Sequence, residues 1–172
     1  APRPSPRPPT DTRPKTLSVT EVEKLIRDPY AVYARRVLEL FPLKDLKSNP
    51  DAAERGTALH AILFRFIDTT KQDWPEDPKA YLMRLAEDVL DETVPWPAAR
   101  RLWLGRLARV ADWFIETEEQ RRQKGRALLL EHSTQMEIPT LGMTLKGTAD
   151  RVDRREDGSL AIYDYKAGSP PS

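Results

Sequence analysis

The stretch Lys146–Gly168 reads K-G-T-A-D-R-V-D-R-R-E-D-G-S-L-A-I-Y-D-Y-K-A-G and decides how we expect the chain to fold. Residues 161–163, Ala-Ile-Tyr, favour a strand. Asp157 and Gly158 have the chemistry of a tight turn between two strands. The stretch therefore predicts an antiparallel hairpin.

Three charged side chains of this hairpin are expected to meet. Asp164 and Lys166 share one strand face, because side chains alternate with a period of two. Closing the hairpin carries Asp150 across to Asp164. Two carboxylates about 5 Å apart repel by roughly 3 kcal/mol at an effective dielectric constant of about 20. A bound cation relieves that repulsion, so the pattern indicates a magnesium site for phosphodiester cleavage.

Asp164 and Lys166 have a plainer interpretation, since exposed strand faces often carry alternating charge. Leu160 and Ile162 share their face, however, and predict that it is largely buried toward the helices. A carboxylate and a lysine that emerge from a buried face favour a functional site.

Five segments together carry a family resemblance. They are G-T-A-D-R-V-D (147–153), I-Y-D-Y-K-A-G (162–168), an entry helix (17–30), R-G-T-A-L-H (55–60) and Glu131, which opens the strand E-H-S-T-Q-M-E-I. Taken in their order along the chain, they resemble the PD-(D/E)xK nucleases, in the branch of RecB-like and Cas4-like exonucleases. The family often has a glutamate at the position of Glu131. The greatest similarity is to the C-terminal nuclease domains of the AddB subunits of bacterial AddAB helicase–nucleases.

The resemblance implies a fold, a reaction and a set of site residues. The fold would be α+β, with a restriction-endonuclease-like core and a mixed or antiparallel sheet preceded by several helices. Mg²⁺, or Mn²⁺ in its place, would be held by Asp150, Asp164, the backbone carbonyl of Tyr165, and His60. Lys166 would orient or help to deprotonate the attacking water and stabilise charge on the phosphate. The activity would be that of an exonuclease at DNA ends in double-strand break repair by recombination, beside an AddA-like partner subunit.

Several residues of the histidine motif keep a second interpretation. His60 lies just off an apolar helical stripe and, without the resemblance, is a partly buried structural histidine. Arg55 either contacts DNA phosphate or is a surface arginine near a helix start. Gly56 either permits close approach of a backbone or merely begins the helix.

Asp150 and Asp153 compete for one role. Their odd separation places them on opposite faces of a regular strand. The family spacing G-x-x-D selects Asp150, which leaves Asp153 as a solvent-facing or hairpin-stabilising charge.

Cysteine usage separates this chain from many of the similar nucleases. Those carry an iron–sulfur cluster whose first cysteine precedes the proline matched by Pro29, but here Asp28 stands there and the chain has no cysteine. We therefore expect no iron–sulfur cluster. The absence of cysteine is compatible with a reducing bacterial cytoplasm.

Composition sets the remaining expectations. The 172 residues suffice for one domain, and a formal net charge of +1 restricts any DNA-binding surface to a local patch. Neither a membrane-spanning run nor a signal peptide is recognisable, so no membrane partner is expected. Residues 1–16 read as a proline-rich linker, and residues 17–172 as a nuclease domain that stops before the family's final helix and strand. The sequence holds no P-loop motif.

Between linker and hairpin the periodicity predicts helices. A first helix capped by Ser18 or Thr20 stops at Asp28-Pro29, and a second piece runs from Tyr30 to Leu40. Residues 43–50 read as a loop. Further helices follow: one with the stripe Leu59, Ile62, Leu63, Phe66 and Ile67, one near 78–93, and one from 97 to about 124 that buries Leu102, Trp103, Val110, Trp113 and Phe114.

Arginines and tryptophans of the helical region have two interpretations each. Arg100, Arg101, Arg106, Arg109, Arg121 and Arg122 could contact phosphates, but interspersed acids, Glu118 among them, favour a salt-bridged solvated face. Trp103 and Trp113 are expected in the core, while Trp74 and Trp96 remain open between packing and base stacking.

Two rival functions come from other classes. The first is a catalytically silent nuclease fold that binds DNA or supports a partner subunit. The second is a helical interaction module in which D-Y-K is accidental. Metal affinity that depends on Asp150 would separate the active nuclease from the interaction module.

Overall fold

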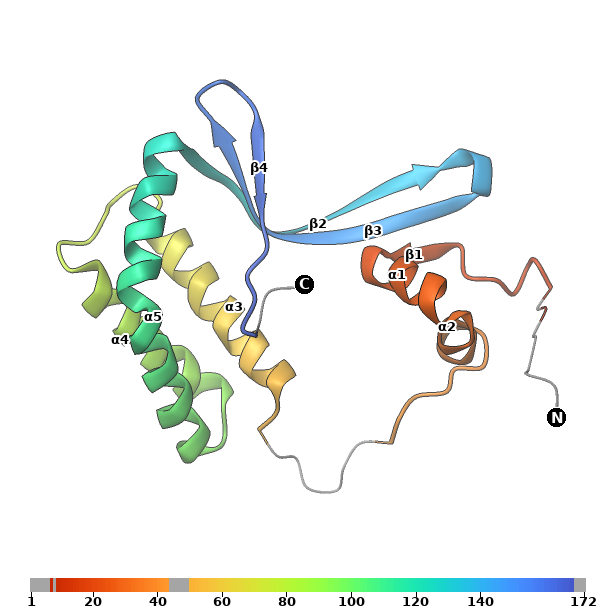
Figure 1. Ribbon diagram of the computed structural model, residues 1–172, viewed down its shortest axis with the longest axis horizontal. Coiled ribbons are helices and arrows are strands. Elements are labelled where there is room, and N and C mark those ends of the chain that lie inside the picture. The colour runs from red at the N-terminus through yellow and green to blue at the C-terminus, as the bar shows by residue number, and fades with distance from the viewer. Residues whose placement is uncertain (1–6, 8, 44–49, 169–172) are drawn as a thin grey trace. The chain divides into compact units, whose positions relative to one another are not determined.

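The structure is a computed structural model and describes residues 7, 9–43 and 50–168. Contacts divide the chain into two compact units, residues 1–48 with 133–148 and residues 49–132 with 149–172. The helices and strands are β1 (Thr16–Ser18), α1 (Val19–Arg27), α2 (Pro29–Arg36), α3 (Ala52–Thr69), α4 (Pro78–Thr93), α5 (Pro97–Lys124), β2 (Gly125–Ile138), β3 (Met143–Arg155) and β4 (Leu160–Tyr163), with a 3₁₀ turn at Pro139–Leu141 (Figure 1).

In the first unit, β1 pairs in parallel with the beginning of β3, from Thr16 opposite Thr144 to Ser18 opposite Lys146. Ser18 caps α1 as expected, because its hydroxyl accepts the Glu21 N–H and Glu21 accepts the Ser18 N–H. Strand β1 starts at the last residue of the expected linker.

Helix α2 is shorter than predicted. Asp28 ends α1 and caps α2, which starts at Pro29 and ends at Arg36 rather than Leu40. Glu39 has a φ of 54°, a left-handed conformation that cannot continue an α-helix. Most of the loop predicted at 43–50 lies outside the described residues.

The core of the second unit is built from α3, α4 and α5, with α4 packed against both of the others (Figure 1). The predicted bounds of α4 and α5 are confirmed. So is the stripe of α3, whose Ile62, Leu63, Phe66 and Ile67 are at most 4% exposed, with Leu59 packed at its margin.

Three of the five residues predicted to be buried on α5 are exposed: Leu102, Val110 and Trp113. The buried side of α5 is a stripe at steps of three and four residues, with Ile115 beside it: Ala99, Trp103, Leu107, Ala111, Phe114 and Glu118. The three exposed residues lie off that stripe. Trp74 and Trp96 pack partly buried against the core, which favours the packing interpretation for both.

The strands form a mixed sheet in which β3 pairs with β1, β2 and β4. The β3–β4 hairpin closes as predicted, with Arg151 opposite Tyr163 and Asp153 opposite Ala161. Gly158 takes a φ of 83° in the turn, a conformation that glycine adopts without strain. The predicted α+β class is confirmed.

The buried face of β4 is the opposite of the predicted one. Leu160 and Ile162 are 60% and 73% exposed, whereas Ala161 is buried. Directly paired residues of an antiparallel ladder share a face, so Ala161 lies with Asp153 on the inner side. That side is occupied by an ion-pair network with α5, described below. Within the described residues no helix combines the length and the apolar character needed to cross a membrane.

Candidate metal centre

Helix α3 positions His60, and one hydrogen bond fixes its ring. The helix starts with a capping box at Asp51 and Glu54, which places His60 in its third turn. The Nε2 atom of His60 lies 2.9 Å from the backbone carbonyl oxygen of Tyr165. A carbonyl only accepts, so Nε2 carries the proton and donates. The other nitrogen, Nδ1, therefore presents a lone pair when the ring is neutral.

Two carboxylates face that lone pair. Asp150 Oδ1 lies 3.5 Å from His60 Nδ1, and Glu131 Oε1 lies 3.6 Å from it. The three ligand atoms all lie within 4.8 Å of one another. Asp150 is nearly buried, whereas His60 and Glu131 are about a third exposed, so the group is open to solvent on one side.

Glu131 reaches this group through an unusual backbone. Its φ is 46°, a left-handed conformation within strand β2. Such a conformation costs a non-glycine residue of order 1–3 kcal/mol and redirects its side chain relative to a regular strand. Of the three converging residues, Glu131 alone was not assigned a role from the sequence. The family position of this glutamate was the available signal.

The donor set fits a divalent cation. Two carboxylate oxygens and one imidazole nitrogen are ligands that Mg²⁺ or Mn²⁺ accepts. Without a cation, two carboxylate charges up to 4.8 Å apart repel by roughly 3 kcal/mol at an effective dielectric constant of about 20. When the ring is neutral, the Nδ1 lone pair faces the same carboxylates and offers them no hydrogen bond. A cation at this position relieves both conflicts.

Tyr165 holds two members of the centre through its backbone. Its N–H donates to Asp150 Oδ2 at 2.6 Å, while its carbonyl accepts from His60. The carbonyl expected to bind the metal thus contacts the histidine ring in this structure. It orients that ring in the way that hydrogen-bonding partners orient metal-ligating histidines.

Asp164 and Lys166 form an ion pair with each other. Lys166 Nζ lies 2.9 Å and 2.7 Å from the two Asp164 oxygens, and both side chains are more than half exposed. Asp164 is not part of the group formed by His60, Glu131 and Asp150. The hydrogen bond to Asp164 raises the pKa of the Lys166 ammonium, and the negative charge of Asp150 adds to that rise. Lys166 is therefore a cation beside the centre.

Arg55 contacts the segment that follows Tyr165. Its Nη2 donates to the Ala167 carbonyl at 3.2 Å, and its buried Nε has no hydrogen-bond partner among the described residues. Arg55 and Lys166 both line a cavity of about 310 Å³ with an apolar floor that includes Trp103. Arg55 is thus neither fully exposed nor a member of the metal centre.

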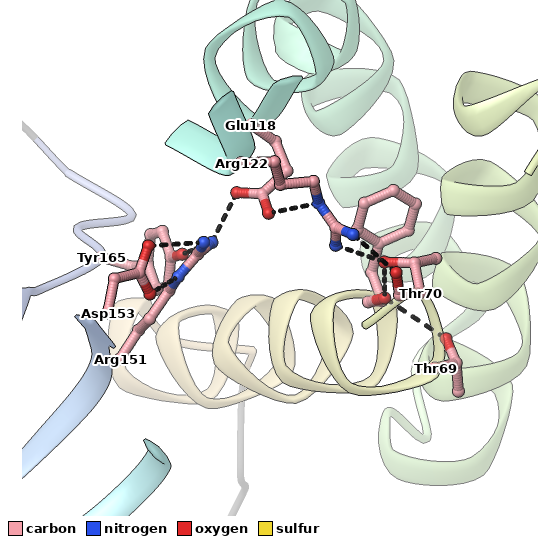
Figure 2. Close-up of polar contacts among 8 residues, drawn as sticks. Thr69, Thr70, Glu118, Arg122, Arg151, Asp153 and Tyr165 are labelled. Atoms are coloured by element: carbon pink, nitrogen blue, oxygen red, sulfur yellow. Dashed lines mark hydrogen bonds and ion pairs between the residues drawn. The ribbon is translucent and has the colours of Figure 1, made fainter. Parts of the chain in front are cut away.

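A buried ion network fastens the hairpin to α5 (Figure 2). Arg151 on β3 donates to both oxygens of Asp153, at 2.5 and 2.8 Å, and to Glu118 on α5 at 2.5 Å. All three side chains are at most 2% exposed. Burial alone would lower the pKa of the Arg151 guanidinium, but hydrogen bonds to Asp153 and Glu118 outweigh it and raise that pKa.

The network continues to the end of α3. Arg122 donates to Glu118 at 2.9 Å and to the backbone and hydroxyl oxygens of Thr70 at 2.6 and 2.7 Å. Figure 2 shows Glu118 between the two arginines. The predictions for Asp153 as a solvent-facing charge and for Glu118 as part of a solvated face are wrong, because both neutralise the buried Arg151.

Comparisons with known proteins give the family. A family model described as the PD-(D/E)XK nuclease superfamily matches residues 16–172. An uncharacterized protein of Rickettsia bellii is 27% identical over 161 residues, which cover 92% of this chain and 19% of that protein. Uncharacterized proteins of Rickettsia typhi and Rickettsia conorii are each 26% identical over 165 residues, covering 92% of this chain and 19% and 20% of theirs.

The chain thus spans about a fifth of the length of these curated relatives. The family model, in contrast, matches nearly all of the chain, including the α3 histidine, both carboxylates of the centre and the D-Y-K segment. The helices and the mixed sheet agree with a restriction-endonuclease-like fold. The chain belongs to the PD-(D/E)XK nuclease superfamily.

Proposed function

We propose that this chain is the metal-dependent nuclease domain of a helicase–nuclease and acts as an exonuclease at DNA ends. The observation that carries the proposal is the convergence of His60 Nδ1, Glu131 and Asp150 within 4.8 Å, in a chain of a nuclease superfamily. Resemblance to the AddB nuclease domains supports the finer assignment to double-strand break repair by recombination. DNA unwinding would then be the task of an AddA-like subunit.

His60, Glu131 and Asp150 would hold Mg²⁺ or Mn²⁺. The resemblance adds Asp164 and the Tyr165 carbonyl to this set, and both remain proposed ligands. Once bound, the ion supplies Lewis-acid activation of the scissile phosphate. The Tyr165 backbone keeps its own part in the proposal, because it fixes the Asp150 carboxylate and the His60 ring in one arrangement.

Lys166 would stabilise negative charge that grows on the phosphate in the transition state. The ion pair with Asp164 raises its pKa, so the neutral amine needed for a general base is scarcer than in free lysine. Of the two roles expected from the sequence, this favours charge stabilisation and orientation of water over deprotonation.

The test is degradation of end-labelled single-stranded DNA by the intact protein in Mg²⁺ or Mn²⁺, compared between wild type and Lys166→Ala. We expect the substitution to lower the cleavage rate at least about a hundredfold, the effect typical of losing one transition-state charge donor. Its side chain is more than half exposed, so the fold should survive. Products should carry 5′-phosphate ends.

Lys79→Ala is the matched control, because Lys79 also pairs with an aspartate at the surface, Asp112, but on α4 and α5. It should cleave at the wild-type rate. Undiminished cleavage by Lys166→Ala would defeat the assignment of Lys166. A folded wild type that binds DNA without cleaving it would move the function to a silent DNA-binding or scaffolding domain.

A further inference from the structure

Gly56 lies inside helix α3, at a position where no contact with the described residues requires a glycine. Glycine in a helix interior is about fivefold less favourable than alanine. A Cβ atom built at Gly56 would have no atom of the described residues within 4 Å. Neither packing nor backbone conformation within the second unit therefore accounts for this residue.

The space beside Gly56 is a groove that leads to the metal centre. Gly56 lies one turn before His60 on α3, so both face the same side of the helix. An open groove of about 570 Å³ is lined by Gly56, His60 and Glu131, and by Ala53, Thr57, Ala61 and Phe64. Two of the three candidate metal ligands thus form part of its wall.

We propose that Gly56 is the point where the sugar-phosphate backbone of the DNA strand crosses α3 on its way to the centre. The inference rests on the proposed function. The missing side chain lets the strand approach the helix backbone closely, one turn from the ligand nitrogen of His60. A charged strand suits this position because a cation held by the centre attracts the phosphates, while Gly56 leaves the path open.

Neighbouring charge agrees with this occupant. Arg55 directly precedes Gly56 on α3. Its guanidinium donates to the Ala167 carbonyl and lines the neighbouring cavity with Lys166. Positive charge on the residue next to Gly56 favours a polyanionic occupant over a neutral one. Without a bound cation, the carboxylates of Glu131 and Asp150 would repel the phosphates of the strand. DNA binding should therefore depend on a divalent cation.

Side chains of increasing size at Gly56 test the inference, with Gly105 as the matched control. Gly105 is the corresponding glycine inside α5; it too has open space at its Cβ position and does not line the groove. Gly56→Ala, Gly56→Leu, Gly105→Ala and Gly105→Leu would be made in the intact protein. Hydrogen exchange of α3 and α5 peptides, Mn²⁺ titration, and anisotropy of a labelled single-stranded oligonucleotide in Ca²⁺ would be compared.

All four variants should slow exchange in their own helix, by up to about fivefold. Gly56→Leu should weaken oligonucleotide binding at least tenfold and Gly56→Ala less, while Mn²⁺ affinity stays at the wild-type value. Both Gly105 variants should bind DNA like the wild type. A helix that gains stability while the protein loses DNA affinity is the combination that a merely structural glycine cannot give.

Three results would overturn the inference. One is equal DNA affinity of Gly56→Leu and Gly105→Leu. Another is faster exchange in α3 of the Gly56 variants, which would mean that the fold needs the glycine. The third is loss of Mn²⁺ affinity in those variants, which would place the effect at the centre. Because binding is measured without turnover, a wild type that binds but never cleaves would refute the proposed function and leave the groove inference standing.

Discussion

Two adjacent residues of β3 belong to two different charge clusters, one a candidate metal centre and the other a buried ion-pair network. Asp150 belongs to the metal centre with His60 and Glu131. Arg151, the next residue, belongs to the buried network with Glu118 and Asp153. Because side chains alternate along a strand, the two clusters lie on opposite faces of β3.

The network is balanced, whereas the centre is not. In the network each carboxylate accepts from an arginine. Arg151 donates to Asp153 and to one oxygen of Glu118, and Arg122 donates to the other oxygen of Glu118. In the centre two carboxylates and the Nδ1 atom of His60 converge, and among the described residues the Tyr165 N–H donates to Asp150 but no hydrogen bond to Glu131 is found. Balanced buried charge holds the fold, and unbalanced acceptors near the surface are available to a cation.

Tyr165 joins the two clusters. Its backbone fixes Asp150 and His60, while its hydroxyl lies 3.5 Å from Arg151 Nη1. Burial raises the pKa of this phenol, and the positive charge of Arg151 opposes that rise. The hydroxyl therefore stays neutral at physiological pH. We infer that the network keeps Tyr165, and with it the centre, in place.

The largest expected effect comes from breaking the balance of the network. Arg151→Met keeps the length of the side chain but leaves Asp153 and one oxygen of Glu118 buried without their cation. Breaking a buried pair in this way costs about 3–5 kcal/mol of the free energy of unfolding. Denaturant unfolding checks it, with Arg65→Met as the control, because the pair of Arg65 with Glu92 is exposed and screened by solvent. Equal effects at both positions would contradict the comparison.

A matched pair of substitutions tests the difference between the clusters directly. Asp150→Asn and Asp153→Asn make the same chemical change three residues apart. The first should lower Mn²⁺ affinity at least about tenfold, equivalent to about 1.4 kcal/mol, and leave the metal-free fold as stable as before. The second should destabilise the fold and spare Mn²⁺ affinity in the protein that remains folded. Titration calorimetry and thermal unfolding together distinguish them, and the reverse assignment of effects would refute the interpretation.

Local patterns allowed much of the fold to be predicted. The hairpin follows from a strand run and the Asp157-Gly158 turn, and α3 from its stripe at helical spacing. A period of two says that Leu160 and Ile162 share a face, but it does not say which face is buried. That choice depends on Arg151 reaching Glu118, a contact across 33 residues. Glu118 on the apolar stripe of α5 was the sign of a buried partner.

The candidate centre was also predictable only in part, because local motifs indicate some of its residues and long-range geometry determines the others. His60 and Asp150 follow from the motifs, and the structure brings them within 3.5 Å. Glu131 converges with them from a backbone with a φ of 46°, a conformation that its residue type does not signal. The family resemblance indicated the Tyr165 carbonyl as a metal ligand, whereas its hydrogen bond with the His60 ring was found only from the geometry.

The smallest expected effect on stability concerns the partly exposed ion pair of Glu21 with Arg36 in the first unit. Two hydrogen bonds from Arg36 lower the pKa of Glu21 from 4.5 to about 2, although burial opposes the shift. A lowered carboxyl pKa stabilises the fold above the unfolded value of about 4.5, and this stabilisation is lost as the pH falls through about 2. Because Arg36 is 42% exposed, we expect no more than about 1 kcal/mol. NMR titration of the Glu21 carboxyl carbon should give a midpoint near 2, which Arg36→Gln returns toward 4.5. A wild-type midpoint near 4.5 would show that this pair does not stabilise the fold. A midpoint near 2 would place its contribution to the free energy of unfolding between those of the buried network and the exposed surface pairs. Burial would then set the order of these three kinds of ion pair.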